Sequence, residues 1–250
     1  MKTIAIIAAG GKGKRIEGVH PDFVPSVLTQ TGARMGTPRD GKFPKQFLML
    51  KDKPILAHTI DKFERCEFID EIISVVPEDY LKYCSQAIVD KYGFKKARKV
   101  ICGGKDRQDS VHSGLKACPN NTSIVVIHDG VRPFISVDKI SESIKICQEK
   151  NAVVLAVSVK ETVKRVEHDS IITTLDRSKL WLTQTPQTFE YKLILEAHEK
   201  AKEDNFVGTD DSALVERLGY EVAILEGDYR NIKITTIEDL QVAEKLLEVG

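Results

Sequence analysis

A glycine-rich, positively charged loop follows the first apolar run of the chain. Residues 8–15 read AAGGKGKR and come directly after TIAII. Gly11 and Gly13 let the backbone adopt positive φ and approach a ligand closely, and consecutive N–H groups in such a loop can bind an anion. Three cations add positive charge, and one of them, Arg15, has a planar guanidinium that matches two phosphate oxygens. The loop predicts a phosphate site; the alternative is an ordinary turn with solvated cations.

Spacing excludes the two common phosphate-binding loops. A Walker A loop requires G-x-x-x-x-G-K-[ST], but Ala8 stands five positions before Gly13, and Arg15 replaces the magnesium-binding hydroxyl. A dinucleotide fingerprint requires a third glycine where this chain has Ile16. The absent glycine also argues against a hydride-transferring Rossmann enzyme.

Further polar clusters follow later apolar runs. In GGKDRQDS (103–110), Gly104 permits close backbone approach, and Ser110 lies near the expected start of a helix. In HDGVRPF (128–134), Asp129 and Arg132 lie beside a proline that fixes the turn. The alternative for Asp129 and Arg132 is a mutual salt bridge that only holds the loop.

Two lysines complete the set of candidate cations. Lys233 lies inside the apolar run NIKITT, and a buried lysine is costly unless it meets an anion. Its alternative is a lysine on an edge strand that faces solvent. Lys45 lies in FPKQFL, just before a short apolar run. Together with Arg15 and Arg132 they could converge on a polyphosphate, with Asp129 nearby.

This pattern favours phosphoryl or nucleotidyl transfer, in which the protein positions anions and stabilises charge on a transferring phosphorus. The sequence shows no Ser–His–Asp or Cys–His set. It shows no metal cage either, although Mg²⁺ held mainly by phosphates needs few protein ligands. The direct ligands of a metal therefore stay unknown at this point.

Composition places these residues in an ordinary globular protein. The 250 residues are 42% hydrophobic, and Lys+Arg equals Asp+Glu at 37 each, so no basic footprint argues for nucleic acid. Five scattered cysteines without C-x-x-C are typical of small buried side chains in a reducing compartment. No apolar run is long enough to span a membrane, and the first strand turns into the charged loop too early for a secretory signal. We expect a cytoplasmic protein.

Strands alternating with helices predict an α/β fold with a mostly parallel sheet covered on both faces. In such sheets, ligands collect at the carboxyl ends of the strands. We expect a single domain over 1–250. The expected strands are 3–9, 71–77, 98–102, 123–129, 152–159, 221–227 and 232–236. The expected helices are 54–66, 79–92, 109–118, 137–149 and 237–248.

Two stretches interrupt this alternation. Residues 17–41 carry three prolines and four glycines without a clear period, which predicts a long loop insertion: either a lid or a disordered segment. Residues 160–185 alternate around a His-Asp-Ser turn and predict a projecting antiparallel hairpin, a β-arm. Because a lone hairpin is marginally stable in water, we expect it to pack on a second subunit.

The motifs occur together in one known family. The chain contains, in order, AGGKGKR, PKQFL, GGKDRQDSV, HDGVRPF, TQTPQTF, TDDSALVE and NIKITTIEDL. This set closely resembles the 2-C-methyl-D-erythritol 4-phosphate cytidylyltransferases. The resemblance implies a Rossmann-like nucleotidyltransferase fold and a homodimer clasped by β-arms. It also implies a Mg²⁺-dependent reaction in which the polyol phosphate attacks the α-phosphorus of CTP and releases pyrophosphate.

The resemblance also implies roles for particular residues. Those at the reacting phosphorus would be catalytic: Arg15, Lys45 and Lys233. Those expected to hold CTP are Gly11, Gly13, Gly104, Ser110 and Gly130. Those expected to hold the polyol phosphate, some of them from the partner subunit's arm, are Asp129, Arg132, Thr162, Arg177, Thr185 and Thr209. A second arginine, Arg34 in the sequence RMG, competes with Arg15; the proximity of Arg15 to Gly13 favours Arg15.

Two rival functions stay open at this stage. The ribitol-5-phosphate cytidylyltransferases share the glycine loop, PKQF and QTPQ, whereas TDDSALVE and the closing motif favour the methylerythritol family. A rival of another class is a CTP-binding regulator without catalysis. The three catalytic candidates argue against it, because a binder does not need all of them at the reacting phosphorus.

Overall fold

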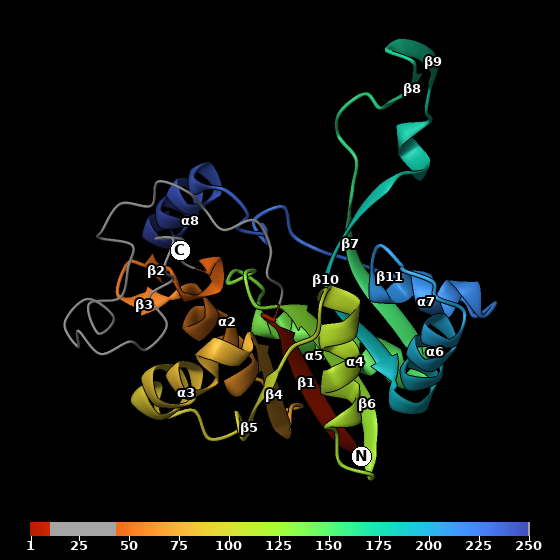
Figure 1. The fold of residues 1–250 in the computed structure, drawn as a ribbon. Coiled ribbons are helices and arrows are strands. Elements are labelled where there is room, and N and C mark those ends of the chain that lie inside the picture. Colours follow the sequence, from red (N-terminus) through yellow and green to blue (C-terminus); the bar gives the residue numbers. More distant parts are fainter. Residues whose placement is uncertain (11–43, 250) are drawn as a thin grey trace.

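The central element is a seven-stranded sheet in the order β11-β7-β10-β6-β1-β4-β5 (Figure 1). The structure is a computed structural model, and it describes residues 1–10 and 44–249. All neighbouring strands pair in parallel except β10, which is antiparallel to both β6 and β7. The strands of this sheet are β1 (Lys2–Ala8), β4 (Glu71–Val76), β5 (Lys99–Cys102), β6 (Thr122–Asp129), β7 (Ala152–Ser158), β10 (Trp181–Glu190) and β11 (Ala223–Glu226).

Helices cover both faces of the sheet, which confirms the predicted α/β class. On one face pack α2 (Ile55–Glu64), the π-helical η4 (Cys84–Asp90) and α5 (Val137–Lys150), and α8 (Ile237–Val249) extends this core beside β2, beyond the ends of the strands. On the other face pack α4 (Arg107–Lys116), α6 (Tyr191–Glu203) and α7 (Asp211–Arg217). In β1, Ala5 and Ile7 belong to the first core, and Ile4 and Ile6 to the second. This strand is apolar along its length because both of its faces are buried.

Several short elements join the main ones. They are η2 (Lys45–Phe47), β2 (Met49–Leu50), β3 (Lys53–Pro54), η3 (Glu78–Tyr80), α3 (Leu81–Tyr83), β8 (Lys164–Glu167), β9 (Ser170–Thr174) and η5 (Arg177–Lys179). The expected helix 79–92 is therefore a succession of 3₁₀, α and π turns. Side-chain caps start the helices that flank the carboxyl ends of the strands. Asp106 accepts from the N–H of Asp109 (2.9 Å), and Asp210 from that of Ala213 (3.0 Å).

The segment 232–236 is not a strand, so that prediction was wrong. After β11 at the edge of the sheet, the chain crosses the carboxyl ends of the strands toward α8, and a crossing segment cannot continue a ladder. The N–H of Ile234 donates to the carbonyl of Val131 (2.9 Å), and Asn231 is buried. These contacts bring Lys233 over the end of β6 rather than to a sheet edge.

A separate two-stranded antiparallel sheet, β8–β9, stands away from the body of the molecule (Figure 1). Every residue of both strands is exposed. This confirms the antiparallel hairpin, but its predicted end at residue 185 was too late. From Trp181 onward, the chain belongs to β10 in the main sheet, where Gln184 to Phe189 are buried. We call residues 160–180 the arm.

Two expectations from the composition concern the cysteines and membrane-spanning segments. Four cysteines are buried as expected, whereas Cys102 at the end of β5 is exposed. Among the described residues, no helix combines the length and the apolar character needed to cross a membrane.

Candidate active site

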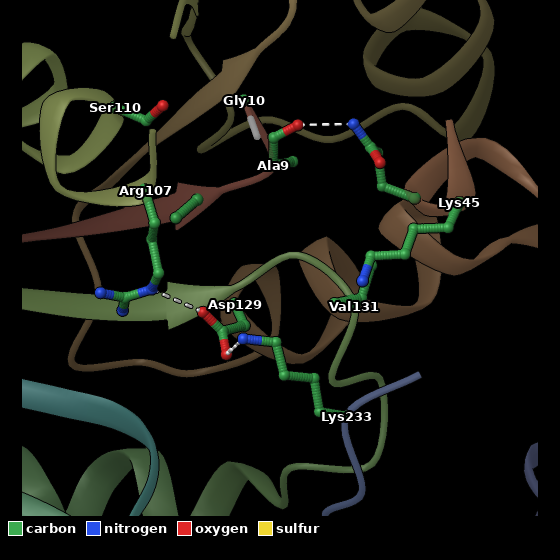
Figure 2. Close-up of a pocket in the computed structure, with 10 residues that line it drawn as sticks. Ala9, Gly10, Lys45, Arg107, Ser110, Asp129, Val131 and Lys233 are labelled. Carbon is green, nitrogen blue, oxygen red and sulfur yellow. Dashed lines mark hydrogen bonds and ion pairs between the residues drawn. The ribbon is translucent and has the colours of Figure 1, made fainter. Parts of the chain in front are cut away.

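A pocket lies at the carboxyl ends of β1 and β6, where ligands are expected in a parallel sheet (Figure 2). Its described lining carries three cations and one carboxylate. It consists of Ala8, Ala9, Gly10, Lys45, Gln46, Arg107, Ser110, Asp129, Val131 and Lys233. Sequence segments more than two hundred residues apart thus meet in one place.

Close backbone approach shapes one wall of the pocket. A Cβ atom on Gly10 would lie only 2.9 Å from the Cα of Gly103 and 2.8 Å from the hydroxyl of Ser110. Glycine is therefore required where the loop after β1 meets the loop after β5. The sequence pattern pointed to Gly11 and Gly13 but not to Gly10, although Gly10 stands in the same glycine run.

Buried Gln46 ties Lys45 to this wall. Its Nε2 donates to the carbonyl of Ala9 at 2.6 Å, which fixes the short helix η2 against the end of β1. Lys45 consequently points into the pocket in Figure 2. Burial lowers the pKa of Lys45, and nearby Lys233 lowers it further, whereas Asp129 raises it. Gln46 was not predicted to matter.

Asp129 is the centre of the charge arrangement. Its Oδ1 lies 3.0 Å from Arg107 Nε, and its Oδ2 lies 2.9 Å from Lys233 Nζ and 3.3 Å from Arg132 Nε. Figure 2 shows Arg107 and Lys233 approaching from opposite sides. Burial alone would raise the pKa of Asp129, but the three cations hold it well below its usual range. The carboxylate therefore stays ionised in the folded protein.

Lys233 and Arg132 both contact Asp129, which bears on the alternatives left open for each of them. Lys233 meets the carboxylate of Asp129, as predicted for a lysine with an anionic partner, but it is only partly buried, with 38% of its side chain exposed. Arg132 does form the mutual salt bridge with Asp129, and its Nη1 also donates to the carbonyl of Asn231 (2.8 Å). Its guanidinium thus braces the segment that carries Lys233. Binding of substrate by Arg132 stays a prediction.

A buried hydrogen-bond chain fixes the backbone of Asp129. The Asp129 N–H donates to the hydroxyl of Thr185, which lies 3.0 Å from His128 Nδ1, and His128 Nε2 lies 3.0 Å from the carbonyl of Arg132. Because a carbonyl only accepts, His128 donates from Nε2 and accepts from Thr185. Burial lowers the pKa of His128 to about 4, so the ring is neutral. Thr185 is buried; contact with substrate stays a prediction.

The antiparallel strand β10, which we did not predict, organises the surroundings. Gln184 donates to the carbonyl of Asp228 (2.8 Å), and Asn231 donates to the carbonyl of Thr185 (2.9 Å). Gln187 accepts from the N–H groups at the start of α7 (3.1 and 3.0 Å). The motif TQTPQTF therefore holds the loops around the pocket rather than lining it.

Three of the predicted CTP residues, Ser110, Gly104 and Gly130, lie at or next to the pocket. The hydroxyl of Ser110 accepts from the N–H of Gly104 (3.1 Å) and donates to the carbonyl of Asp106 (2.7 Å). Gly130 follows Asp129, and its N–H donates to the carbonyl of Ala8 (2.9 Å). Ser110 lines the pocket itself, whereas Gly104 and Gly130 support it. Nucleotide contacts of these residues stay predictions.

The remaining predicted residues lie elsewhere. Thr162 and Arg177 are on the arm, both exposed, and Arg177 Nη1 donates to the carbonyl of Lys160 (2.6 Å). Thr209 is exposed in the loop before α7. None of the three lines the pocket within the described part of this chain. Predictions for the glycine loop and the insertion, namely Gly11, Gly13, Arg15, Arg34 and 17–41, fall outside the described residues.

Arg107 is the functional candidate that sequence reasoning missed. It lines the pocket and contacts Asp129, yet in the sequence it is only one member of the cluster GGKDRQDS. Burial alone would lower its pKa, but Asp211 and Asp129 raise it, so the guanidinium stays charged. Its position among acidic residues just inside a helix start was the available signal, but only the fold shows which carboxylates it meets.

A metal would find few protein ligands here. Over residues 1–10 and 44–249, no three His, Cys, Asp or Glu side chains cluster closely enough to hold an ion. Both oxygens of Asp129 face cations. The pocket therefore has the chemistry of a site for phosphate groups, which could bring a metal ion with them.

The family model and the relatives that match this sequence carry the same enzyme name. The family model of 2-C-methyl-D-erythritol 4-phosphate cytidylyltransferase (IspD) matches residues 24–249. A protein of that name from Geotalea uraniireducens is 46% identical over 99% of this chain and 97% of its own length. One from Clostridioides difficile is 47% identical over 82% of this chain and 86% of its own length.

Solved structures agree with the sequences. The crystal structure of 4-diphosphocytidyl-2C-methyl-D-erythritol synthase from Anaerococcus prevotii superimposes with a TM-score of 0.77 at 32% identity. It covers 99% of this chain and 98% of its own. The cytidylyltransferase from Thermus thermophilus superimposes with a TM-score of 0.69 at 30% identity, over 82% of this chain and 94% of its own.

Proposed function

This chain belongs to the 2-C-methyl-D-erythritol 4-phosphate cytidylyltransferase family, and we propose that it transfers a cytidylyl group in the pocket around Asp129. The substrates are CTP and 2-C-methyl-D-erythritol 4-phosphate, in non-mevalonate isoprenoid biosynthesis. A phosphate oxygen of the polyol attacks the α-phosphorus, the bond from this phosphorus to the bridging oxygen breaks, and pyrophosphate leaves.

One observation carries the assignment to this pocket. Lys45, Lys233 and Arg107 face a cavity that contains a single carboxylate, so the described lining has an excess of positive charge. Charge that develops on the transferring phosphorus is stabilised most by donors already in place. Lys45 and Lys233 are the ammonium groups of this lining and would serve as catalytic residues. Arg107 is pinned between carboxylates and supports the site.

The two substrates would occupy opposite sides of the pocket. CTP would lie on the wall of Ser110, which Gly104 supports, together with Gly11 and Gly13, and Gly130, next to Asp129, would lie between the two substrates. The polyol phosphate would lie on the side of Asp129, where an ionised carboxylate can accept hydrogen bonds from hydroxyl groups.

The arginine at the reacting phosphorus has two candidates. Arg15 follows the glycine run, whereas the family match begins at residue 24 and so includes Arg34 but not Arg15. Replacing the catalytic one by alanine should lower kcat by ~10²–10³-fold, the size of one lost transition-state contact. Comparing Arg15→Ala with Arg34→Ala decides between them, and a larger loss for Arg34→Ala would overturn the assignment of Arg15.

We propose Mg²⁺ as the cofactor, carried to the site by the phosphates of CTP. Mg²⁺ commonly binds through substrate phosphates with few protein ligands, which agrees with a described pocket whose one carboxylate faces cations. Bound there, the ion would offset phosphate charge. Activity should vanish with excess chelator and return with added Mg²⁺.

We further propose that the protein is a cytoplasmic homodimer joined through the arm. The arm exposes Val166, Ile171, Ile172 and Leu175, which a partner would cover. In a two-fold dimer, Thr162 and Arg177 of one arm would then reach the polyol phosphate in the partner's site. Sedimentation velocity measures the state, and a monomer at micromolar concentration would contradict it.

Release of pyrophosphate from CTP tests the function directly. Methylerythritol phosphate and ribitol phosphate are offered side by side with Mg²⁺, and we expect clear preference for the first. Preference for ribitol phosphate would keep the chemistry and reject the substrate. Binding of CTP without release of pyrophosphate for any polyol phosphate would indicate the regulator; the family membership does not favour either rival.

A further inference from the structure

Arg107, the first residue of α4, lies between two buried carboxylates from distant parts of the chain. Its Nε lies 3.0 Å from Asp129 Oδ1, and its Nη2 lies 2.8 Å from Asp211 Oδ2. Asp129 lines the pocket, whereas Asp211 begins α7 behind it. The first contact is a hydrogen bond, whereas the second is a close ion pair whose angles are not those of a hydrogen bond. The orientation of Arg107 is therefore set partly from outside the pocket.

Asp211 is itself held by buried groups. Its side chain is 1% exposed, and its Oδ1 lies 3.2 Å from Nε2 of His198, whose side chain is 0% exposed. Burial alone would raise the pKa of Asp211, but Arg107 and His198 lower it. An ionised carboxylate only accepts hydrogen bonds, so His198 donates from Nε2. The Asp211 N–H also donates to Gln187, which anchors the start of α7 (3.1 Å).

The contacts continue from Arg107 to the opposite side of the pocket. Arg107 faces one oxygen of Asp129, while Lys233 faces the other at 2.9 Å. A rotation of the guanidinium would therefore remove the contact on Oδ1 and change how this oxygen is presented to the pocket, while Lys233 and Arg132 still hold Oδ2. Nothing else in the described pocket contributes a second acidic group to take over this role.

We propose that Asp211 is a positioning residue for the reaction: supported by His198, it fixes Arg107, which orients Asp129 toward Lys233 and the polyol phosphate. This inference rests on the proposed function, because that function places the polyol phosphate beside Asp129. Asp211 touches no substrate. Its effect reaches the site only through Arg107, and it should act on the polyol phosphate rather than on CTP.

Steady-state kinetics of Asp211→Asn tests this selectivity. The amide keeps the shape but removes the charge that holds Arg107. We expect the KM for methylerythritol phosphate to rise about tenfold, as for one weakened charge-assisted contact. The KM for CTP and kcat should change less than about twofold, because a contact equal in ground and transition states affects KM alone. An unchanged KM, or an equal rise for both substrates, would overturn the proposal.

A double-mutant cycle tests whether the effect passes through Arg107. Lysine at this position keeps a charge but cannot contact both carboxylates, so Asp211→Asn should add little to Arg107→Lys. Independent, multiplying effects would contradict the proposed route. The matched control is Glu199→Gln on the exposed side of α6, where the carboxylate pairs only loosely with Lys116 (3.4 Å). It should leave both KM values unchanged.

Two further measurements keep the test decisive. If Asp211→Asn does not fold by circular dichroism, His198→Phe removes the donor alone and should raise the same KM to a smaller extent; no rise would reject the proposal. If the wild type does not turn over methylerythritol phosphate, the proposed function fails. Exchange of the Arg107 Nε–H proton with water, followed in ¹⁵N spectra, then tests the positioning role. Exchange should be slow in the wild type and in Glu199→Gln, and fast after loss of Asp211 or His198. Equal exchange in all would overturn it.

Discussion

The pocket and the arm contain similar kinds of polar contact in opposite surroundings. In the pocket, Arg107 pairs with Asp129 at 3.0 Å, and the two side chains are 28% and 6% exposed. On the arm, Arg165 pairs with Glu167 at 3.3 Å, and the two side chains are 59% and 56% exposed. Water and salt screen the second pair but hardly reach the first.

This difference separates what the chain fixes by itself from what needs a partner. Asp129 and the three cations that contact it are held by contacts within the domain, so their arrangement does not need a partner. The arm has no core of its own among the described residues, and its apolar side chains face outward. A hairpin of this kind is marginally stable alone. We therefore expect substitutions in the pocket and in the arm to fail in different ways.

The largest effect should come from Lys45→Met. Removing an ammonium group from the reacting phosphorus should lower kcat by ~10²–10³-fold. The melting temperature should not fall, because the substitution also removes a charge that burial disfavours. The measurement is pyrophosphate release at saturating substrates. As a control, Lys62→Met on α2 removes the same charge away from the pocket and should retain full activity; a comparable loss there would contradict a local role for Lys45.

Acid should weaken the pocket through His128. Its folded pKa is about 4, below the unfolded value near 6.5, so between these values the unfolded chain binds a proton that the folded chain does not. Stability contributed by neutral His128 is thus complete above pH 6.5 and is lost as the pH falls toward 4. The loss amounts to at most about 3 kcal/mol.

Denaturant unfolding at fixed protein concentration between pH 7 and pH 4 measures this dependence. In His128→Gln, the free energy of unfolding should fall less steeply over that range than in the wild type. His168→Asn is the control on the arm; its backbone φ of 48° suits asparagine, and it should keep the wild-type slope. Equal slopes in all three proteins would rule out His128 as the source.

Arg177→Ala should have a smaller effect, because it removes one contact that the arm makes with the polyol phosphate. We expect the KM for the polyol phosphate to rise about tenfold, the value of one charge-assisted contact. Mixed with Lys45→Met and assayed at polyol phosphate well below KM, the variant should regain activity, because a mixed dimer has one site with both intact residues. Random mixing predicts about one quarter of wild-type activity in a two-fold dimer. No recovery would place Arg177 in the site of its own subunit.

The smallest effect is expected from Arg165→Gln on the arm. It removes the exposed ion pair with Glu167, which the arm has in place of the buried Arg107–Asp129 pair. The free energy of unfolding should change by less than about 0.5 kcal/mol. Urea unfolding measures the change. A loss of several kcal/mol would show that the arm is more tightly held than its exposure indicates, and would remove the contrast between the two regions.

The alternating strands and helices were predictable because each repeats a local pattern. Buried runs such as those of β1 and β6 need apolar side chains on both faces, and this is visible in the sequence. Strand β10 was missed because TQTPQTF is polar, and its buried glutamines are satisfied only by partners from distant segments. The segment around Lys233 was mistaken for a strand because its apolar residues, such as Ile234, are buried although the segment only crosses the ends of the strands.

The residues of the candidate site also fall into those that the sequence could assign and those that it could not. Asp129, Lys45, Lys233 and Ser110 could be named in advance because motifs of charged and small residues follow apolar runs. Arg107 and Asp211 could not be assigned, because an arginine among several acids gives no indication of which of them it will meet. The same limit applied to Arg132, for which the sequence left both a salt bridge and a substrate contact open.

By itself, the sequence determined the α/β class, the family and the charged groups available for cytidylyl transfer. Periodicity and short motifs are local properties, and they are readable along the chain. Tertiary structure alone decided that Asp129 faces three cations, that His128 is neutral, and that Asp211 reaches the site through Arg107. These features depend on burial and on distances between segments far apart in sequence, and electrostatic interactions take their strength from both.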